Sequence, residues 1–387
     1  MSDPEREPIP EQELEKTIVR PLRVKRASFA WPEPAPRPRP KQQPSASRTR
    51  PGWVPLRRVV AGLAAALLLL SLGLLGFKLG SILPAPGGRE PAAEDPLLHP
   101  LTGAVLPAET ESRLLCAVVD NSPEARPQSG LEQAALIYEL PVEADIPRLL
   151  LCYYGEDAPA VGPIRSARPY LVDIVRGWGG VLAHCGWSPA AQSLLEQGAA
   201  DYINEQEQPS YFRRDPGREA PHNLYTSTAE LYQAVDELGL AAAQTLPAFR
   251  FRDPADEPAG TPAHRLELEF NGAETSYIYD GNRRAYARFV NDDRFTDAAS
   301  GSQIFAANII LQYVDARVTD EEGRLELDLS SGGEALLFSG GTLTRGRWTR
   351  TGPDAPIRYT DASGEDFALL PGQTWIEVCG GDIPVSF

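Results

Sequence analysis

The feature that most constrains this 387-residue chain is an uncharged apolar run of 19 residues, 59–77. Its length is close to the roughly 20 residues that an α-helix needs to cross the hydrocarbon core of a bilayer. A cleaved signal peptide is the alternative, but a leader of 58 residues and so long an apolar run favour an uncleaved span. We therefore predict a single transmembrane helix over residues 59–83.

The charges on the two sides of this run predict its orientation. Residues 1–58 contain 13 Lys and Arg against 7 Asp and Glu, whereas only Lys78 follows the apolar run closely. Positively charged flanks stay in the cytoplasm. We therefore predict that residues 1–58 form a disordered, Pro- and Arg-rich cytoplasmic tail. A linker over residues 84–113 should then hold the rest of the chain outside the membrane.

The charge balance of residues 84–387 argues against one class of partner. This part contains 46 acidic side chains against 23 arginines and no lysine. A groove that binds nucleic acid needs a basic face, which such a balance does not favour. The partner that the sequence itself indicates is the cytoplasmic membrane, reached through one helix.

Residues 114–247 combine short buried strands with helices. Apolar runs bounded by Gly, Pro and Asn are typical of strands in a covered sheet, and they occupy residues 114–119, 135–140, 149–154 and 180–185. Helices are predicted to begin at Pro169, at Ser188-Pro189 and at the capping box Ser227-x-x-Glu230. The first helix is expected to end near Gly177. This part is predicted to be an α/β domain.

The character of the chain changes after residue 263. Apolar and polar residues alternate between turn signals, which predicts strands over residues 265–270, 275–280, 285–290, 323–329 and 374–378. The predicted fold class is therefore α/β. A layered α/β domain (114–247) is followed by a connecting strand and loop and then by a mostly β domain (264–387).

Two arginines and a serine precede the first predicted helix. Arg165, Ser166 and Arg168 come just before Pro169, where unpaired backbone N–H groups and the helix dipole favour an anion. Each guanidinium adds paired donors for a carboxylate or phosphate. The alternative is that both arginines form structural ion pairs with nearby Asp or Glu. We predict an anion-binding site here.

Other polar side chains lie where predicted strands end or helices begin, which is where an open α/β sheet forms its ligand crevice. They are Asp120, Asn121, Glu139, Glu143, His184, His222 and Asn223. Alternatively, Asp120 and Asn121 form a turn, the carboxylates pair with arginines, and His222 and Asn223 make local hydrogen bonds. No dense ligand motif supports a metal site, so none is predicted, and the sequence names no cofactor.

Three of the four cysteines, Cys116, Cys152 and Cys185, lie in apolar strand runs. We expect them to be small buried side chains rather than nucleophiles. Outside the membrane a disulfide between Cys116 and Cys152 is conceivable, but spacing alone cannot show it.

Several motifs follow one another along the extracytoplasmic part of the chain. They are Pro100-Leu-Thr-Gly103, Ala117-Val-Val-Asp-Asn121, Arg126-Pro-Gln-Ser-Gly130, Tyr138-Glu-Leu-Pro-Val-Glu143, Gly162-Pro-Ile-Arg-Ser-Ala-Arg168, Pro221-His-Asn-Leu-Tyr-Thr-Ser227, Asn308-Ile-Ile, Gly346-Arg-Trp348 and Pro371-Gly-Gln-Thr-Trp375. Together they resemble the YerB-like family of bacterial cell-envelope proteins. The resemblance implies a layered α/β domain of unknown function with a smaller C-terminal companion, and no established activity. Members are often lipoproteins, whereas here a long tail and an apolar span stand in place of a lipid anchor.

The function we expect is binding of an anionic envelope ligand, such as a wall-polymer phosphate or a peptide carboxylate, by a single-pass membrane protein. Arg165, Ser166, Arg168 and His222 would hold the ligand. One alternative is a cell-envelope hydrolase that uses His184 or His222 as base. Another is a scaffold that presents its two domains to an envelope protein and has no small-molecule site, so the expected partners are the membrane and either an anionic wall ligand or an envelope protein.

A further hypothesis is that the two domains share one site. Tyr277, Tyr286 or Arg288 would then complete it from the β domain, because ligand crevices often form where domains meet. The alternative is that the β domain packs on the sheet and only stabilises it.

Overall fold

The structure is a computed structural model that describes residues 97–106, 112–143, 146–240, 246–256, 259–270, 273–380 and 383–387. The predicted tail (1–58) and transmembrane helix (59–83) lie outside these residues. Within the described ranges, no helix is both long enough and apolar enough to cross a membrane. Part of the expected linker is described, and Leu101 in it is fully buried. The Pro100 carbonyl there accepts a hydrogen bond from the Phe249 N–H.

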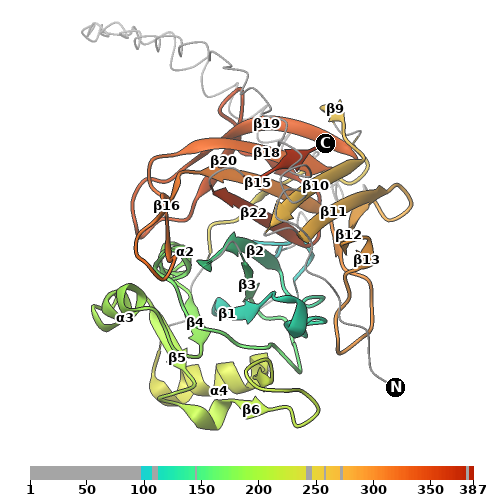
Figure 1. The fold of residues 1–387 in the computed structure, drawn as a ribbon. Coiled ribbons are helices and arrows are strands. Elements are labelled where there is room, and N and C mark those ends of the chain that lie inside the picture. Colours follow the sequence, from blue (N-terminus) through green and yellow to red (C-terminus); the bar gives the residue numbers. More distant parts are fainter. Residues whose placement is uncertain are drawn as a thin grey trace, which may run out of the picture. The chain divides into compact units, whose positions relative to one another are not determined.

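The centre of the fold is an 11-stranded mixed sheet that takes strands from both halves of the chain (Figure 1). The first half supplies β1 (Leu115–Asp120), β2 (Leu136–Pro141), β3 (Pro147–Tyr153), β4 (Val181–His184) and β5 (Asp201–Asn204). The second half supplies β9 (Thr261–Pro262), β15 (Asn308–Val314), β18 (Gly333–Ser339), β19 (Thr342–Thr349), β20 (Arg358–Asp361) and β22 (Thr374–Gly380). The spatial order is β20-β19-β18-β15-β22-β2-β3-β1-β4-β5, with β9 beside β19. The halves join where β2 and β22 run parallel.

Both faces of this sheet are covered, which explains why its strands are continuous apolar runs. All six residues of β1 are buried. Because side chains alternate along a strand, Leu115, Ala117 and Val119 pack into one core. Cys116 and Val118 pack into the core on the opposite face.

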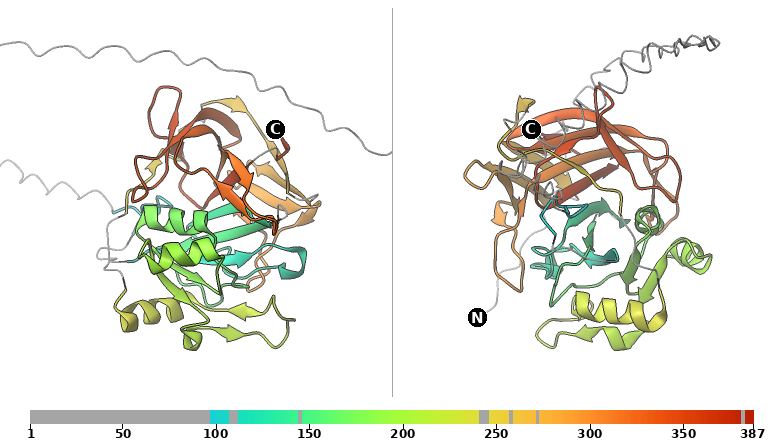
Figure 2. Two further views of the ribbon diagram at one scale, coloured as in Figure 1. Left: turned by 60° about the vertical axis from the view of Figure 1, so that its left-hand side comes forward. Right: turned by 180° about the vertical axis from the view of Figure 1, so that it is seen from behind.

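One face is covered by α2 (Pro169–Trp178) and α3 (Pro189–Glu196), which lie side by side (Figure 2). The small hairpin β16 (Ala316–Val318) and β17 (Leu325–Leu327) adds to this layer. The helix α2 ends at Trp178, near Gly177 as predicted, and is capped by Gly179, whose φ of 64° is left-handed. Gly177 lies inside the helix, where a Cβ would come within 2.6 Å of the Ala355 carbonyl oxygen. It is therefore explained by close packing rather than by a helix stop.

The opposite face is covered by α4 (Thr228–Leu238) and by a second sheet. That sheet contains β10 (Arg265–Phe270), β11 (Ala273–Asp280), β12 (Ala285–Val290), β13 (Asp293–Arg294), β14 (Phe305–Ala306) and β23 (Val385–Ser386). The predicted capping box of α4 is confirmed, because the Ser227 hydroxyl accepts from the Glu230 N–H at 3.1 Å and lies 2.8 Å from the Glu230 carboxylate.

The described chain is thus layered, as predicted, but its sheets are mixed and strands outnumber helices. The two short ladders β6 (Arg213–Arg214) with β7 (Leu224–Tyr225) and β8 (Arg250–Phe251) with β21 (Ala368–Leu369) add further strand. The 3-10 turns are η2 (Pro123–Ala125) and η4 (Pro209–Tyr211). The label α/β therefore holds only in part, because the regular elements of the second half, in the residues described, are all strands, and several of them belong to the central sheet.

A charged cluster is sealed between the two sheets. Arg288 on β12 is fully buried, and its guanidinium lies 2.6 Å from Glu139 on β2 and 3.2 Å from Glu377 on β22. The Tyr277 hydroxyl contacts both Arg288 and Glu377. The guanidinium also lies 4.5 Å from the ring centre of Trp375, at a distance typical of a cation–π contact. Side chains from both halves of the chain thus meet around one charge.

The two carboxylates of this cluster sit on directly paired residues of β2 and β22. Burial raises the pKa of Glu377 well above its usual range, the neighbouring Glu139 raises it further, and Arg288 only partly opposes both effects. The neutral form of Glu377 is therefore favoured, and the shorter of the two Arg288 contacts is the one with Glu139.

We predict that Arg288→Met strongly destabilises the protein, because it leaves two buried carboxyl groups without their cation. The expected loss is about 3–5 kcal/mol in the free energy of unfolding, as for other broken buried ion pairs. Urea unfolding of the full chain, followed by tryptophan fluorescence, measures it. Arg317→Met is the matched control, since Arg317 pairs with Glu326 in solvent and should cost less than about 1 kcal/mol. Equal losses in both variants would contradict the prediction.

Candidate functional site

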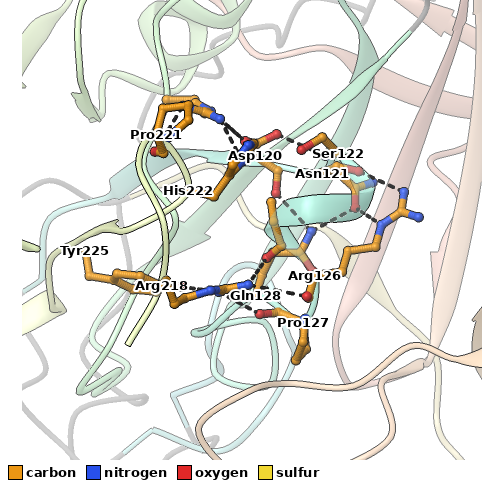
Figure 3. A network of polar contacts seen from close by, with 12 residues as sticks. Asp120, Asn121, Ser122, Arg126, Pro127, Gln128, Arg218, Pro221, His222 and Tyr225 are labelled. Carbon is orange, nitrogen blue, oxygen red and sulfur yellow. Dashed lines mark hydrogen bonds and ion pairs between the residues drawn. The ribbon is translucent and has the colours of Figure 1, made fainter. Parts of the chain in front are cut away.

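A cluster of three charged or ionisable side chains lies at the carboxyl end of β1 (Figure 3). The Asp120 Oδ2 atom lies 2.6 Å from the Arg165 Nε atom and 2.8 Å from the His222 Nδ1 atom. The Arg165 guanidinium and the His222 ring are themselves 2.8 Å apart, and the guanidinium also donates to the Pro221 carbonyl at 3.1 Å. Asp120 is almost fully buried, whereas the other two side chains are about one-fifth exposed. The cluster therefore opens towards solvent.

Two backbone hydrogen bonds and one side-chain hydrogen bond hold the segment that carries Arg165. The segment before α2 runs beside the end of β1, where the Arg165 N–H donates to the Val118 carbonyl and the Asp120 N–H donates to the Pro163 carbonyl. The Arg148 side chain on β3 donates to the Ser166 carbonyl at 2.7 Å. Arg165 and Ser166 are thus held over the end of the central sheet.

The surroundings of Asp120 favour its ionised form. Burial alone would raise the pKa of this carboxyl group. The Ser122 N–H, Arg165 and His222 outweigh that effect and hold the pKa below its usual value. At neutral pH the Asp120 carboxylate therefore orients both the guanidinium and the imidazole.

A buried chain of hydrogen bonds leads from this cluster towards the core, and Figure 3 shows its first members, Asn121 and Gln128, beside Asp120. The Asn121 amide donates to Glu139 at 2.7 Å, so it reaches the carboxylate that pairs with Arg288. The Gln128 amide donates both to the Asn121 side chain at 2.8 Å and to the Asp120 carbonyl at 2.9 Å. Asn121 and Glu139 are fully buried. They therefore support the cluster on its interior side and do not face solvent.

Two adjoining cavities lie next to the cluster. The Arg165 cavity, of about 520 Å³, is lined by Arg165, Ser166, Trp187, Arg214 and Pro221 among others. The Arg218 cavity, of about 530 Å³, is lined by Arg213, Arg214, Asp215, Arg218 and Tyr225 among others. The Arg214 side chain lines both, so the two cavities are neighbours on one surface.

Arg218 differs from the other arginines of this surface in its partners. Its guanidinium donates to the carbonyls of Ala125, at 2.9 Å, and Pro127, at 3.1 Å, and contacts the Tyr225 hydroxyl. Arg213 and Arg214 instead face carboxylates at 2.6 and 3.4 Å. In the part of the chain that the structure describes, no carboxylate lies within ion-pair distance of Arg218. Its positive charge is therefore not matched by an ion pair.

Arg168 lies apart from the cluster. It occupies the residue before α2 and forms a two-pronged ion pair with Glu143, with distances of 2.6 and 2.9 Å. Burial would raise the pKa of Glu143, but Arg168 more than offsets it and the pKa is lowered. Arg168 therefore forms a structural ion pair, which was the alternative to anion binding. It lines neither cavity. Asn223 is closer to the site, since its side-chain oxygen accepts from Arg214 at 3.0 Å.

His184 is enclosed in the interior. Its ring is fully buried and lies 5.5 Å from the Trp187 ring and 5.7 Å from the Tyr202 ring, measured between centroids. Nδ1 donates to the Gly186 carbonyl at 2.9 Å. Nε2 has no hydrogen-bond partner among the described residues. Burial lowers the pKa of His184 to about 4, so the ring is neutral, and its enclosure does not suit an exposed general base.

The second half of the chain contacts the buried residues behind the site, but contributes little to the solvent-facing cluster and its cavities. Arg288 and Tyr277 meet Glu139 through the buried cluster, and the Tyr286 hydroxyl donates to the Ala263 carbonyl instead. Arg165 and His222 form their ion pairs and side-chain hydrogen bonds, within the described ranges, only with residues of the first half. Ala298 is the one lining residue of the two cavities that the second half contributes. No group of three or more His, Cys, Asp or Glu among the described residues could hold a metal ion.

Sequence reasoning missed the arginines of β6 and of the turn that follows it, and the positioning residues behind the cluster. The run from Arg213 to Arg218 contains three arginines in six residues of an otherwise acidic chain, a local signal that could have been used. Arg126 and Gln128, which hold Asn121, belong to a motif that indicated the family but not their place behind the cluster.

The fold and this site define a class: a two-sheet protein whose first half carries a pair of arginine-lined cavities. Two family models match the chain. "Protein of unknown function (DUF3048) N-terminal domain" matches residues 101–241, and the corresponding C-terminal domain matches residues 266–376. The chain belongs to this YerB-like family, as its motifs predicted.

One relative and one solved structure support this membership. The chain is 34% identical over 288 residues to the "Putative lipoprotein YerB" of Bacillus subtilis (strain 168), covering 73% of this chain and 86% of the relative. It is also similar to the crystal structure of the YerB protein from Bacillus subtilis, with a TM-score of 0.69 and 31% identity, over 75% of this chain and all of that one. Neither name states a ligand or a reaction.

We predict that His184 makes the protein less stable as the pH falls from about 6.5 to about 4. The folded ring has its pKa lowered to about 4, so in this window the unfolded chain binds a proton that the folded chain does not. Stability is full above the usual pKa and is lost as the pH falls, by about 3 kcal/mol in all.

The measurement is urea unfolding of the wild-type chain and of His184→Gln at about pH 7 and about pH 4.5. Glutamine keeps a polar side chain but does not titrate, so packing losses affect both pH values alike. The wild type should lose about 2 kcal/mol more than the variant between these pH values. Parallel losses would show that His184 is not the cause.

Proposed function

We propose that this protein is a membrane-anchored extracytoplasmic binding protein that takes an anionic envelope ligand at the Arg165 and Arg218 cavities. The name of its Bacillus relative, "Putative lipoprotein YerB", supports the location, as does the apolar run at residues 59–77. The candidate ligands carry phosphate or carboxylate groups, as wall polymers and peptides do.

The observation that carries the proposal is the state of Arg218. Its guanidinium lines a cavity, is oriented by backbone carbonyls, and has no carboxylate partner in the described chain. Asp215 lines the same cavity, but its carboxylate accepts the Gly217 N–H at 2.8 Å. A partly buried cation without a counter-ion offers an anion the most favourable binding free energy, because no carboxylate has to be displaced first.

Arg165 and His222 support binding in the adjoining cavity. Asp120 already accepts from both side chains, so its charge is engaged and the remaining N–H groups of the guanidinium are held in place. A pre-oriented guanidinium loses less conformational freedom when a ligand binds. Arg214, which lines both cavities, would contact a ligand in either.

We predict that the full chain, purified in mild detergent, binds sn-glycerol 3-phosphate or an acetylated dipeptide carboxylate, measured by isothermal titration calorimetry. Arg218→Gln should weaken binding by roughly tenfold or more, because a hydrogen bond to a charged group contributes about 1.5–3 kcal/mol. Arg165→Gln should act in the same direction, and added salt should weaken binding to the wild type.

Arg317→Gln is the control for this experiment, because Arg317 is an exposed arginine far along the sequence on the β16–β17 hairpin. It should leave the affinity unchanged. If neither probe binds, or if both cavity variants bind as tightly as the wild type, the proposed function is wrong.

A hydrolase is the second candidate, favoured by one contact. Asp120 holds the Nδ1 atom of His222 at 2.8 Å, an arrangement in which a carboxylate orients an imidazole whose Nε2 can act as base. Ser166 lines the same cavity as Arg165, but no described hydrogen bond joins it to His222. Binding is therefore the better supported function. Hydrolysis of bis(p-nitrophenyl) phosphate or p-nitrophenyl acetate that falls about a hundredfold in folded His222→Ala would reverse this order.

A further inference from the structure

Two cysteines face each other across the central sheet. Cys116 on β1 and Cys152 on β3 are directly opposite residues of an antiparallel pair. Both side chains are fully buried in the core beneath α2, and their sulfur atoms are in contact, 2.6 Å apart. Cys185 instead contacts Glu205, and Cys379 contacts the Glu377 carbonyl. Only one pair of cysteines in the described chain is therefore in position to react.

The backbone geometry suits a covalent bond between them. Directly opposed residues of antiparallel strands have Cα atoms about 4.5–5.5 Å apart. This separation lies within the roughly 4.4–6.8 Å that a disulfide bridges. Their side chains also point to the same face of the sheet, so no backbone movement is needed to join them.

The alternative is that both are small buried hydrophobic side chains with free thiols. In the structure both are free thiols that touch, so the two sulfurs need no rearrangement to reach each other and only an oxidant is required to join them. The location proposed above does not favour this alternative, because disulfides form and persist outside the cytoplasm.

We propose that Cys116 and Cys152 form a disulfide bond in the exported protein. The two thiols pass two protons and two electrons to a second disulfide, which is thereby reduced to two thiols. In the cell a thiol oxidoreductase carries this second disulfide, and in vitro it is oxidised glutathione. Because both side chains are buried in the folded core, the exchange takes place before α2 covers them. This proposal rests on the extracytoplasmic location but does not depend on anion binding.

The bond would act on the candidate site through the strands that it joins. The chain between the two cysteines carries Asp120, which belongs to the cluster, and Asn121 and Glu139, which support it from the buried side. On β3, Arg148 holds the Ser166 carbonyl at 2.7 Å. Joining β1 to β3 therefore fixes the two strand ends that bear the cluster.

The test is mass spectrometry of the full chain after export to an oxidising envelope. The protein is unfolded in urea, alkylated with iodoacetamide without reductant, and digested with trypsin. Arg148 lies between the two cysteines, and Arg126 is followed by proline, which trypsin does not cut. The expected product is residues 114–148 joined to residues 149–165, with Cys185 and Cys379 alkylated. Reductant should release the two peptides.

Two variants and a stability measurement complete the test. Cys152→Ala should leave Cys116 open to alkylation, whereas Cys185→Ala should leave the joined peptides intact. Reductant should lower the thermal midpoint of the wild type by roughly 5–10 °C and should not change that of Cys152→Ala. Alkylation of all four cysteines without reductant, or a bond from either residue to Cys185 or Cys379, would overturn the proposal.

Discussion

The buried contact of Arg288 with Glu139 and Glu377 is the interaction on which the rest of the structure depends. Removing an arginine and two carboxyl groups from water is costly, and only close pairing offsets the cost. That pairing requires β2 and β22 to lie in register and β12 to lie above them. A shift of one residue along either strand would turn a carboxylate to the opposite face. The cluster therefore selects one alignment of the two halves.

The same cluster reaches the surface through a short series of buried amides. Glu139 accepts from Asn121, which Gln128 links to the backbone of Asp120. A buried polar network of this kind holds its members in one arrangement when every partner is present. Arg165 and His222 thus contact the Asp120 carboxylate, and buried hydrogen bonds fix the position of Asp120. This explains how a chain rich in acidic side chains can hold arginines at fixed places beside two cavities.

The sequence predicted local structure well and long-range structure poorly. The bounds of β10 and β12 and the start of α2, α3 and α4 agree with the structure, because alternation and capping are properties of neighbouring residues. The pairing of β2 with β22 leaves no local signal. Arg288 is fully buried although arginine is among the residue types least often buried, and its two carboxylate partners come from strands far away in the sequence. Arg165 and Arg168 share one motif and differ in their surroundings, which spacing cannot distinguish.

The place of β22 in the central sheet has a consequence for biogenesis. This strand belongs to the last part of the chain, but it lies between β15 and β2 and is hydrogen-bonded to both. Until it emerges, β2 and β15 each present an unpaired edge to other chains. The sheet is therefore completed only after nearly the whole polypeptide has been made. Chains that stop early would expose these edges and become substrates for proteases and chaperones.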